Sequence, residues 1–185
     1  MRVIGGSRRS LPLKSVPGEK TRPTQDRIRE TLFNMLSPYV SGSLFIDLFS
    51  GTGAVGIEAL SRGADHAYFV EKNRQAFEII KENISFTKFE HESTLYRMDI
   101  MEGISAIEKA EEKECGIIFM DPPYHDGYEE PVIRRLSDSS LTGRDTLIIV
   151  EADIKTDFSF AEKHGFSVFK NKEYKTSKHV WLKRT

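Results

Sequence analysis

The segment 44–63 constrains the fold of this chain more than any other. It reads Leu-Phe-Ile-Asp-Leu-Phe-Ser-Gly-Thr-Gly-Ala-Val-Gly-Ile-Glu-Ala-Leu-Ser-Arg-Gly: an apolar run, a glycine-rich turn and a stretch with helical periodicity. A strand that passes through a glycine turn into a helix forms the nucleotide-binding corner of an open α/β sheet. The free N–H groups and the positive dipole end of the helix point into that corner. We therefore predict a ligand site where the helix begins, and a helix end at Gly63 in the left-handed conformation.

The glycines of this turn indicate a cofactor that contains a nucleoside. Gly51, Gly53 and Gly56 satisfy the pattern GxGxxG, and Glu71 follows Gly51 by 20 residues, as the dinucleotide fingerprint requires. A bare GxGxxG also occurs where the glycines serve packing only. The preceding strand and the following acid favour the cofactor, but they leave open which cofactor it is.

Size and composition indicate one intracellular domain. The chain has 185 residues and a single cysteine, Cys115, which excludes an internal disulfide framework and suits a reducing compartment. The apolar neighbours of Cys115 predict a buried thiol. No apolar run approaches the ~20 residues that span a bilayer, and residues 1–9 lack the apolar segment of a signal peptide. The histidines show no metal-ligand spacing. We expect a soluble, cytoplasmic monomer with no metal and no membrane partner.

The charge is unevenly distributed along the chain. The net charge is only −1, but residues 1–30 carry eight basic and three acidic side chains. A basic end on an acidic body is typical of a protein that meets a polyanion there, although a solvated tail has the same composition. We predict a basic arm or short hairpin over 1–22, not a packed subdomain, and the main domain over 23–185.

Strand and helix patterns alternate after residue 44. Apolar runs predict strands over 44–49, 67–71, 94–98, 116–121 and 146–151, and helical spacing predicts helices over 53–62, 73–87, 101–113 and 127–138. Five strands with crossover helices predict an α/β fold with a doubly wound, mostly parallel sheet that is covered on both faces. Two final strands, 166–170 and 178–183, predict a terminal hairpin whose last strand is antiparallel, with Trp181 in the core.

A further helix is predicted before the first strand. It follows Arg22-Pro23, extends to about Leu36 and is ended by Pro38. Its buried face is predicted from helical spacing to comprise Ile28, Leu32, Met35, Leu36 and Tyr39. Arg27 and Arg29 need not point into that core.

A second motif, Asp121-Pro122-Pro123-Tyr124, ends the strand 116–121 and therefore falls beside the glycine turn. Two prolines fix the backbone, so that the Asp121 carboxylate and the Pro122 carbonyl form a rigid pair of acceptors. Such a pair suits a planar NH2 group, and Tyr124 offers an aromatic face on which a base can stack, which contributes about 1–3 kcal/mol. A stiff turn is the simplest alternative explanation, but the aromatic residue and the glycine corner favour a functional site.

Together these motifs resemble those of S-adenosylmethionine-dependent methyltransferases that modify exocyclic amino groups. The stretch 22–34, Arg-Pro-Thr-Gln-Asp-Arg-Ile-Arg-Glu-Thr-Leu-Phe-Asn, is similar to the entry helix of the RsmD-type methyltransferases, which methylate N2 of one guanine in bacterial 16S ribosomal RNA. The resemblance extends from about residue 2 to the end of the chain. It implies a Rossmann-like class I methyltransferase fold with a short basic arm, S-adenosylmethionine as the cofactor, and the small ribosomal subunit or its assembly intermediate as the partner.

The resemblance also implies a role for each motif residue. The catalytic set would be Asp121, Pro122 and Tyr124. The cofactor set would be Asp47, Gly51, Gly53, Glu71, Asp99 and Ile100, in which Asp47 orients the loop or the amino-acid end of the cofactor, Glu71 accepts from the ribose hydroxyls, Asp99 accepts from the adenine amino group and Ile100 packs on the ring. The RNA-binding set would be Arg8, Arg9, Arg22 and Arg27. A helix-capping role for Asp99 is compatible with its cofactor role.

Two other functions remain open at this stage. A methyltransferase that acts on adenine N6, or on guanine N2 of another RNA or DNA, would use the same amino-group site. A nicotinamide-dependent oxidoreductase would explain the glycines and Glu71, but it leaves Asp121, Tyr124 and the basic arm without a role.

Overall fold

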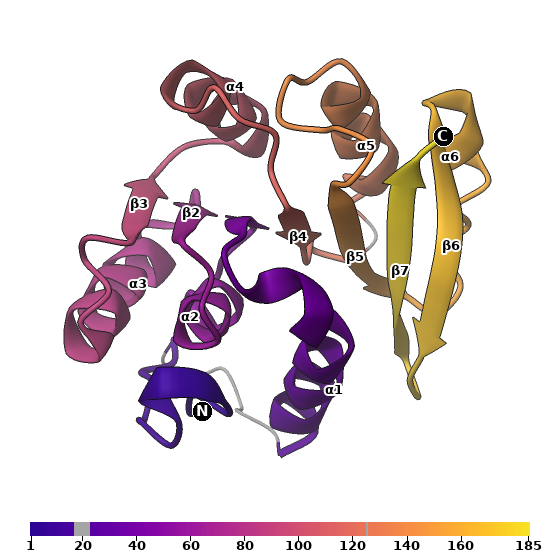
Figure 1. Cartoon of the computed structure of the whole chain (residues 1–185). Coiled ribbons are helices and arrows are strands. Elements are labelled where there is room, and N and C mark those ends of the chain that lie inside the picture. The colour runs from indigo at the N-terminus through magenta and orange to yellow at the C-terminus, as the bar shows by residue number, and fades with distance from the viewer. Residues whose placement is uncertain (17–22, 125) are drawn as a thin grey trace.

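The computed structural model, which describes residues 1–16, 23–124 and 126–185, contains one seven-stranded sheet. Its strand order is β3-β2-β1-β4-β5-β7-β6, and β7 is antiparallel to both of its neighbours while β1 to β5 are parallel (Figure 1). This confirms the predicted doubly wound sheet and the terminal hairpin. The strands are β1 (Leu44–Leu48), β2 (His66–Val70), β3 (Ser93–Tyr96), β4 (Ile117–Met120), β5 (Leu147–Asp153), β6 (Phe166–Glu173) and β7 (Ser177–Arg184).

Helices cover both faces of the sheet. In Figure 1, α1, α2 and α3 lie on one side, together with the N-terminal residues, and α4, α5 and α6 lie on the other. Because each crossover between parallel strands is right-handed, the chain must change faces when it reverses direction across the sheet, which it does after β3. The helices are α1 (Pro23–Val40), α2 (Ala54–Ser61), α3 (Arg74–Thr87), α4 (Ile100–Ala110), α5 (Glu129–Ser137) and α6 (Phe160–Lys163), with a 3-10 turn η1 (Gly6–Arg8) before them.

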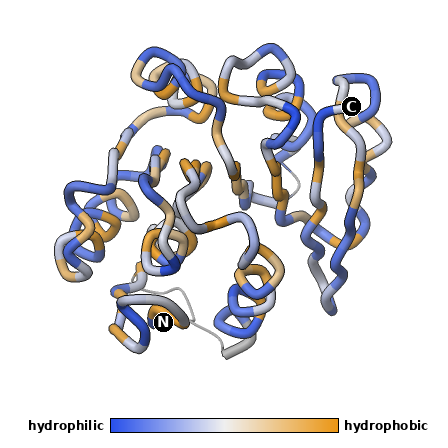
Figure 2. The backbone as a smooth tube through the Cα atoms, in the orientation of Figure 1, coloured by the Kyte–Doolittle hydropathy of each residue, from blue (hydrophilic) through white to orange (hydrophobic). Residues whose placement is uncertain are grey.

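Each face of the sheet has its own apolar core. On the α1–α3 side, Phe33, Phe45 and Trp181 are almost completely buried, and on the α4–α6 side Ile104, Leu136 and Phe166 are. Figure 2 shows the helices with hydrophobic residues on part of their surface and hydrophilic residues on the rest, as expected when one side of each helix packs on the sheet. The predictions of a buried Trp181 and a buried Cys115 are confirmed.

The first helix departs from its prediction in length and in phase. It continues to Val40, and Pro38 lies inside its last turn, where the missing N–H removes a single helical bond. The fully buried side chains are Leu32, Phe33, Leu36 and Val40, while Tyr39 is 46% exposed, so its placement in the core was wrong. Arg29 is buried instead, and its guanidinium Nη2 donates to the Arg2 carbonyl at 2.6 Å and to Asp26 at 3.1 Å. Arg29 thus joins α1 to the N-terminal residues.

The pairing register brings the ends of the parallel strands to one level. Leu48 pairs with Val70 on one side and with Met120 on the other, and Met120 pairs with Val150. The residues that follow, among them Glu71, Asp121 and Glu151, therefore line one edge of the sheet. The glycine turn after β1 opens onto the same edge.

Candidate active site

The glycine turn has the backbone conformation that the sequence predicts. Gly51 and Gly53 have φ angles of +55° and +76°, and Gly53 N–H donates to the Ser50 carbonyl at 2.7 Å. Positive φ favours glycine at both positions. Glycine is needed at position 56 for a different reason, since a Cβ there would lie 2.3 Å from Phe69 Cε1 of β2. The three glycines therefore make the turn and allow α2 to pack on the sheet.

Asp47 fixes the start of α2 from inside the protein. Its side chain is buried, and Oδ2 accepts a hydrogen bond from Gly56 N–H at 2.9 Å, one of the N–H groups that lack a partner within the helix. Burial raises the pKa of Asp47 from 3.8 to about 7; the bond from Gly56 opposes this shift, and the charge of Glu71 adds to it. Asp47 thus fixes the first turn of α2, directly after the glycine turn, and its role toward the cofactor stays a prediction.

Glu71 connects the glycine turn to the segment after β2. Its Oε2 accepts from Gly51 N–H at 2.8 Å and its Oε1 from Asn73 N–H at 2.7 Å. Each carboxylate oxygen can accept a second bond, and the side chain is only half-buried. Glu71 can therefore hold the turn in shape and still accept from a hydroxyl group.

Asp99 caps α4, as the compatible alternative predicts. Its Oδ1 accepts from Met101 N–H at 3.1 Å, and its Oδ2 lies 3.5 Å from Lys72 Nζ. Ile100 is buried at the first position of the helix. Lys72 and Asp99 follow β2 and β3, so this pair extends the same edge of the sheet outward from Glu71.

The segment after β4 combines an accessible carboxylate with an exposed ring. Asp121 is accessible to solvent, Pro122 is buried and Tyr124 is 39% exposed. Although water reaches Asp121, the surrounding protein atoms desolvate it. This desolvation and the negative charges of Glu151 and Asp47 raise the pKa of Asp121 well above its ordinary value. Desolvation also raises the pKa of Tyr124, as does the charge of Glu151, to whose Oε1 its hydroxyl donates at 3.5 Å.

Three site residues were missed from sequence. They are Glu151, His179 and Tyr174. The Oε2 atom of Glu151, on β5, lies 3.1 Å from Nε2 of His179, and Nδ1 of His179 lies 3.2 Å from the Tyr174 hydroxyl. His179 is buried on β7. Burial and the charge of Glu151 raise the pKa of Tyr174 to about 12. The sequence showed only that Glu151 ends one apolar run and that His179 lies inside another. It did not show that the two side chains meet, because their contact depends on the pairing of β7 with β5.

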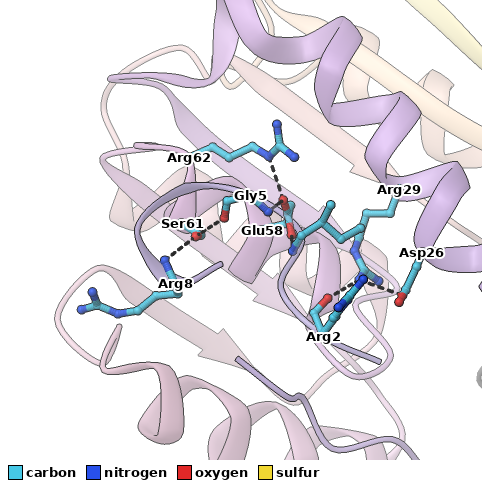
Figure 3. Close-up of polar contacts among 9 residues, drawn as sticks. Arg2, Gly5, Arg8, Asp26, Arg29, Glu58, Ser61 and Arg62 are labelled. Carbon is cyan, nitrogen blue, oxygen red and sulfur yellow. Dashed lines mark hydrogen bonds and ion pairs between the residues drawn. The ribbon is translucent and has the colours of Figure 1, made fainter. Parts of the chain in front are cut away.

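The N-terminal arm docks on α2 through a buried carboxylate that the sequence pattern also did not reveal. Glu58 accepts from Ile4 N–H at 2.7 Å, from Gly5 N–H at 2.8 Å and from Arg62 Nε at 2.7 Å (Figure 3). Met1–Leu13 form a short antiparallel hairpin with an Arg2–Pro12 bridge, and Val3 and Leu13 are buried in the core. A hairpin was predicted, but its described residues pack firmly on the main domain.

The end of this hairpin contacts the glycine turn. The Asn83 side chain of α3 accepts from Lys14 N–H at 2.8 Å, and it donates to the Lys14 carbonyl at 3.1 Å and to the Thr52 carbonyl at 2.9 Å. Asn83 is almost completely buried. One amide thus joins the arm to the loop between Gly51 and Gly53.

The four arginines of the predicted RNA-binding set are placed very differently. Arg8 lies at the ends of α2 and α3 that face away from the glycine turn. Its N–H donates to Ser61 Oγ at 2.9 Å (Figure 3). Its Nε donates to the Thr87 carbonyl at 2.7 Å. Arg9 and Arg27 are exposed. Arg22 lies outside the described residues. Arg27 lies on α1, close in sequence to Arg29, the residue that contacts Arg2.

The described residues contain neither a metal-binding cluster nor a membrane-spanning helix. Across residues 1–16, 23–124 and 126–185, no three His, Cys, Asp or Glu side chains are grouped so that they could bind a metal ion. No helix in the same ranges has both the length and the apolar character of a membrane span.

Comparison with known proteins extends over the whole chain. The family model described as "Conserved hypothetical protein 95" matches residues 1–183. YlbH of Bacillus subtilis strain 168 is 38% identical over 153 residues, 83% of this chain and 83% of YlbH. Ribosomal RNA small subunit methyltransferase D of Escherichia coli strain K12 is 35% identical over 159 residues, 84% of this chain and 76% of that protein. The solved structure of yhhF from Escherichia coli superposes with a TM-score of 0.83 at 31% identity and covers 100% of this chain and 97% of that one.

Proposed function

Since this chain belongs to the RsmD family of ribosomal RNA methyltransferases, we propose that it transfers a methyl group from S-adenosylmethionine to N2 of one guanine in 16S ribosomal RNA, of the guanine-966 type. The observation that supports this most is the position of Asp121 and Pro122 at the carboxyl edge of the sheet, beside the glycine turn. The reaction would take place in the cytoplasm, on the small subunit or on an assembly intermediate.

The residues at this edge fit a nucleoside cofactor. A Cβ added at Gly51 would meet no heavy atom within 4 Å, so the backbone there faces open space. Glu71 and Asp99 lie beside it with oxygen lone pairs to spare. These residues, with Asp47 behind the loop and Ile100 beside Asp99, would hold S-adenosylmethionine. When bound, this cofactor supplies a methyl group that its sulfonium has already activated.

Asp121 and Pro122 would direct the amino group of the base. The lone pair of guanine N2 is delocalised into the ring, and accepting both N–H bonds turns that lone pair toward the methyl carbon. The amino nitrogen becomes positively charged and acidic as the new bond forms, and Asp121 can then take its proton. The raised pKa of Asp121 makes it a better proton acceptor than an ordinary aspartate. Tyr124 would stack on the base after the base leaves its helix.

The direct test is methyl transfer to small-subunit RNA. Labelled S-adenosylmethionine is incubated with 30S subunits and with naked 16S RNA from cells that lack this protein, and the product is identified by nucleoside mass spectrometry. We expect N2-methylguanosine, and the better substrate of the two shows whether ribosomal proteins are needed. N6-methyladenosine as the product would contradict the choice of base, and an enzyme that fails to bind the cofactor would contradict the whole proposal.

Replacing Asp121 tests its catalytic role. We expect Asp121→Asn to lower kcat by on the order of 100- to 1,000-fold, because an amide accepts one N–H of the base but takes up no proton. Cofactor affinity, measured by calorimetry, should stay within a few-fold of wild type. Asp138→Asn, an exposed change at the end of α5, is the control. Turnover near the wild-type rate in Asp121→Asn would remove Asp121 from the chemistry.

The cofactor site is tested separately at Glu71. Replacement by Ala removes the acceptor of Gly51 N–H and Asn73 N–H as well as the proposed ribose contact. We expect S-adenosylmethionine to bind at least ~10-fold more weakly, since a charged acceptor contributes about 1.5–3 kcal/mol. Unchanged affinity in calorimetry would show that Glu71 does not contribute to cofactor binding.

A further inference from the structure

Glu151 stands level with Asp121 on the neighbouring strand. Met120 pairs with Val150 between β4 and β5, so Asp121 and Glu151 follow at the same height, and Glu151 pairs with His179 of β7. The negative charge of Glu151 acts on Asp121 strongly enough to raise its pKa. The end of β4 and its neighbour β5 therefore present two carboxylates at the same level, of which the sequence motif includes only Asp121.

The Glu151 carboxylate is held in place by side chains of β7 and of the segment after β4. Its Oε2 contacts His179 Nε2 at 3.1 Å, its Oε1 accepts from the Tyr124 hydroxyl at 3.5 Å, and Tyr174 in turn contacts His179. The Glu151 side chain retains 19% of its exposed surface, whereas that of His179 retains 1%. Each carboxylate oxygen can accept two hydrogen bonds, so both oxygens keep capacity for a ligand.

An edge made only of acceptors distinguishes guanine from adenine. Guanine presents N1–H and the two N–H bonds of N2 side by side, three donors in a row. Adenine presents the N–H bonds of N6 next to N1, which is an acceptor and would face a carboxylate without a proton between them. Adjacent carboxylates also repel one another until a donor lies between them. The pair Asp121 and Glu151 thus matches the guanine edge.

We propose that Glu151 selects guanine by accepting the N1–H of the base while Asp121 and the Pro122 carbonyl accept the N–H bonds of N2. This assignment rests on the proposed function and deepens it, because the Asp-Pro-Pro-Tyr motif alone recognises an amino group on either purine. His179 and Tyr174 position Glu151, and Tyr124 contacts both the carboxylate and the face of the base.

2-Aminopurine separates recognition of N1–H from recognition of the amino group. It keeps the 2-amino group, but its N1 carries no hydrogen and is an acceptor. The test uses 30S particles reconstituted with 16S RNA that carries either guanine or 2-aminopurine at the methylated position. We expect wild-type enzyme to prefer guanine in kcat/KM by on the order of 100-fold or more, because the analogue leaves a buried acceptor facing an acceptor.

Glu151→Gln should reverse much of this preference, because the amide N–H can donate to N1 of 2-aminopurine. We expect slower methylation of guanine, faster methylation of 2-aminopurine and a preference within about 10-fold. Glu130→Gln is the matched control, since Glu130 forms a comparable glutamate–histidine pair, with His164 at 3.3 Å, and has no part in the proposed recognition of the base. It should keep the wild-type preference.

The outcomes separate the two proposals. Equal methylation of both bases by wild-type enzyme, or an undiminished preference in a folded Glu151→Gln enzyme, would overturn the role of Glu151 and leave the proposed function intact. If the wild-type enzyme binds S-adenosylmethionine but methylates neither base in any particle, the proposed function fails and this inference fails with it.

Discussion

At the scale of single residues, Asp47 shows what burial of a carboxyl group costs within the described site. It is a buried carboxyl whose pKa is raised from 3.8 to about 7. A group whose pKa is raised on folding binds more protons in the native state than in the unfolded chain between these two values. The free energy of unfolding therefore decreases as pH rises through that interval. The shift corresponds to about 4 kcal/mol at most, at about 1.4 kcal/mol for each pH unit.

Asp47→Asn tests this prediction. The amide oxygen can still accept from Gly56 N–H, but the side chain no longer ionises. We expect the stability of the variant relative to wild type to increase by on the order of 2–4 kcal/mol between pH 4 and pH 8. Urea denaturation at a series of pH values measures it, and comparison of the two proteins cancels the titration of all other groups. A constant difference across this range would show that Asp47 ionises normally.

The residue scale also shows what could be predicted from sequence. Glu71 and Asp121 were predicted as site residues from local features, the glycine fingerprint and the Asp-Pro-Pro-Tyr motif, and Asp47 and Asp99 from the family resemblance. Glu151, His179 and Glu58 were not identified, because their partners come from distant segments: His179 reaches Glu151 only through the β5–β7 pairing, and Glu58 meets the backbone of Ile4 and Gly5. Buried polar groups are decided by tertiary neighbours, which hydrophobic periodicity does not contain.

At the scale of elements, the hairpin of residues 1–13 is the feature that the sequence described least well. Its composition indicated a solvated or RNA-binding arm, and the same basic residues proved to be part of a packed element. Arg8 donates to the end of α3, and the Arg2 carbonyl accepts from Arg29. The contact with Arg2 also accounts for the buried position of Arg29 on α1, which helical spacing did not predict.

Gly6 offers a specific way to weaken this docking. Its φ is +75°, and a Cβ there would lie 1.7 Å from the Ser61 carbonyl oxygen of α2. Gly42 has the same φ, but nothing lies within 4 Å of its Cβ position, so it is a matched control. We expect Gly42→Ala to lower the free energy of unfolding by about 1 kcal/mol, because alanine disfavours a positive φ and nothing else changes.

Gly6→Ala should lower the free energy of unfolding by at least ~2 kcal/mol more than the control does, because the hairpin must move away from α2. Denaturant unfolding gives both values, and hydrogen exchange at Ile4, Gly5 and Lys14 reports the docking itself. Equal costs for the two substitutions would mean that η1 shifts while keeping its hydrogen bonds to α2.

At the scale of the whole molecule, positive charge on the α1 side of the sheet should govern RNA affinity. Arg27 is exposed on α1, and Arg9 is exposed on the hairpin. We expect Arg9→Ala with Arg27→Ala to reduce affinity for 16S RNA and to lower the slope of log K against log salt by about 0.7–0.9 for each phosphate that the variant no longer neutralises.

Filter binding at several salt concentrations measures this slope. Arg134→Ala is the control, since Arg134 is exposed on α5, on the other side of the sheet. Equal slopes for the double variant and the wild type would return both arginines to the status of solvated surface charges.

The docked hairpin also determines when this chain can finish folding. Ile4 bonds to a carboxylate 54 residues further along, and Arg8 to a carbonyl 79 residues further along. On the ribosome these residues are made long before α2 and α3, so Val3 and Leu13 remain without their apolar partners until both helices have emerged. The sheet adds a second delay, because β7 inserts between β5 and β6 and is made after both. At both ends of the molecule, segments that are synthesised early therefore pack only after later segments have been made. The nascent chain exposes apolar side chains and unpaired strand edges throughout synthesis.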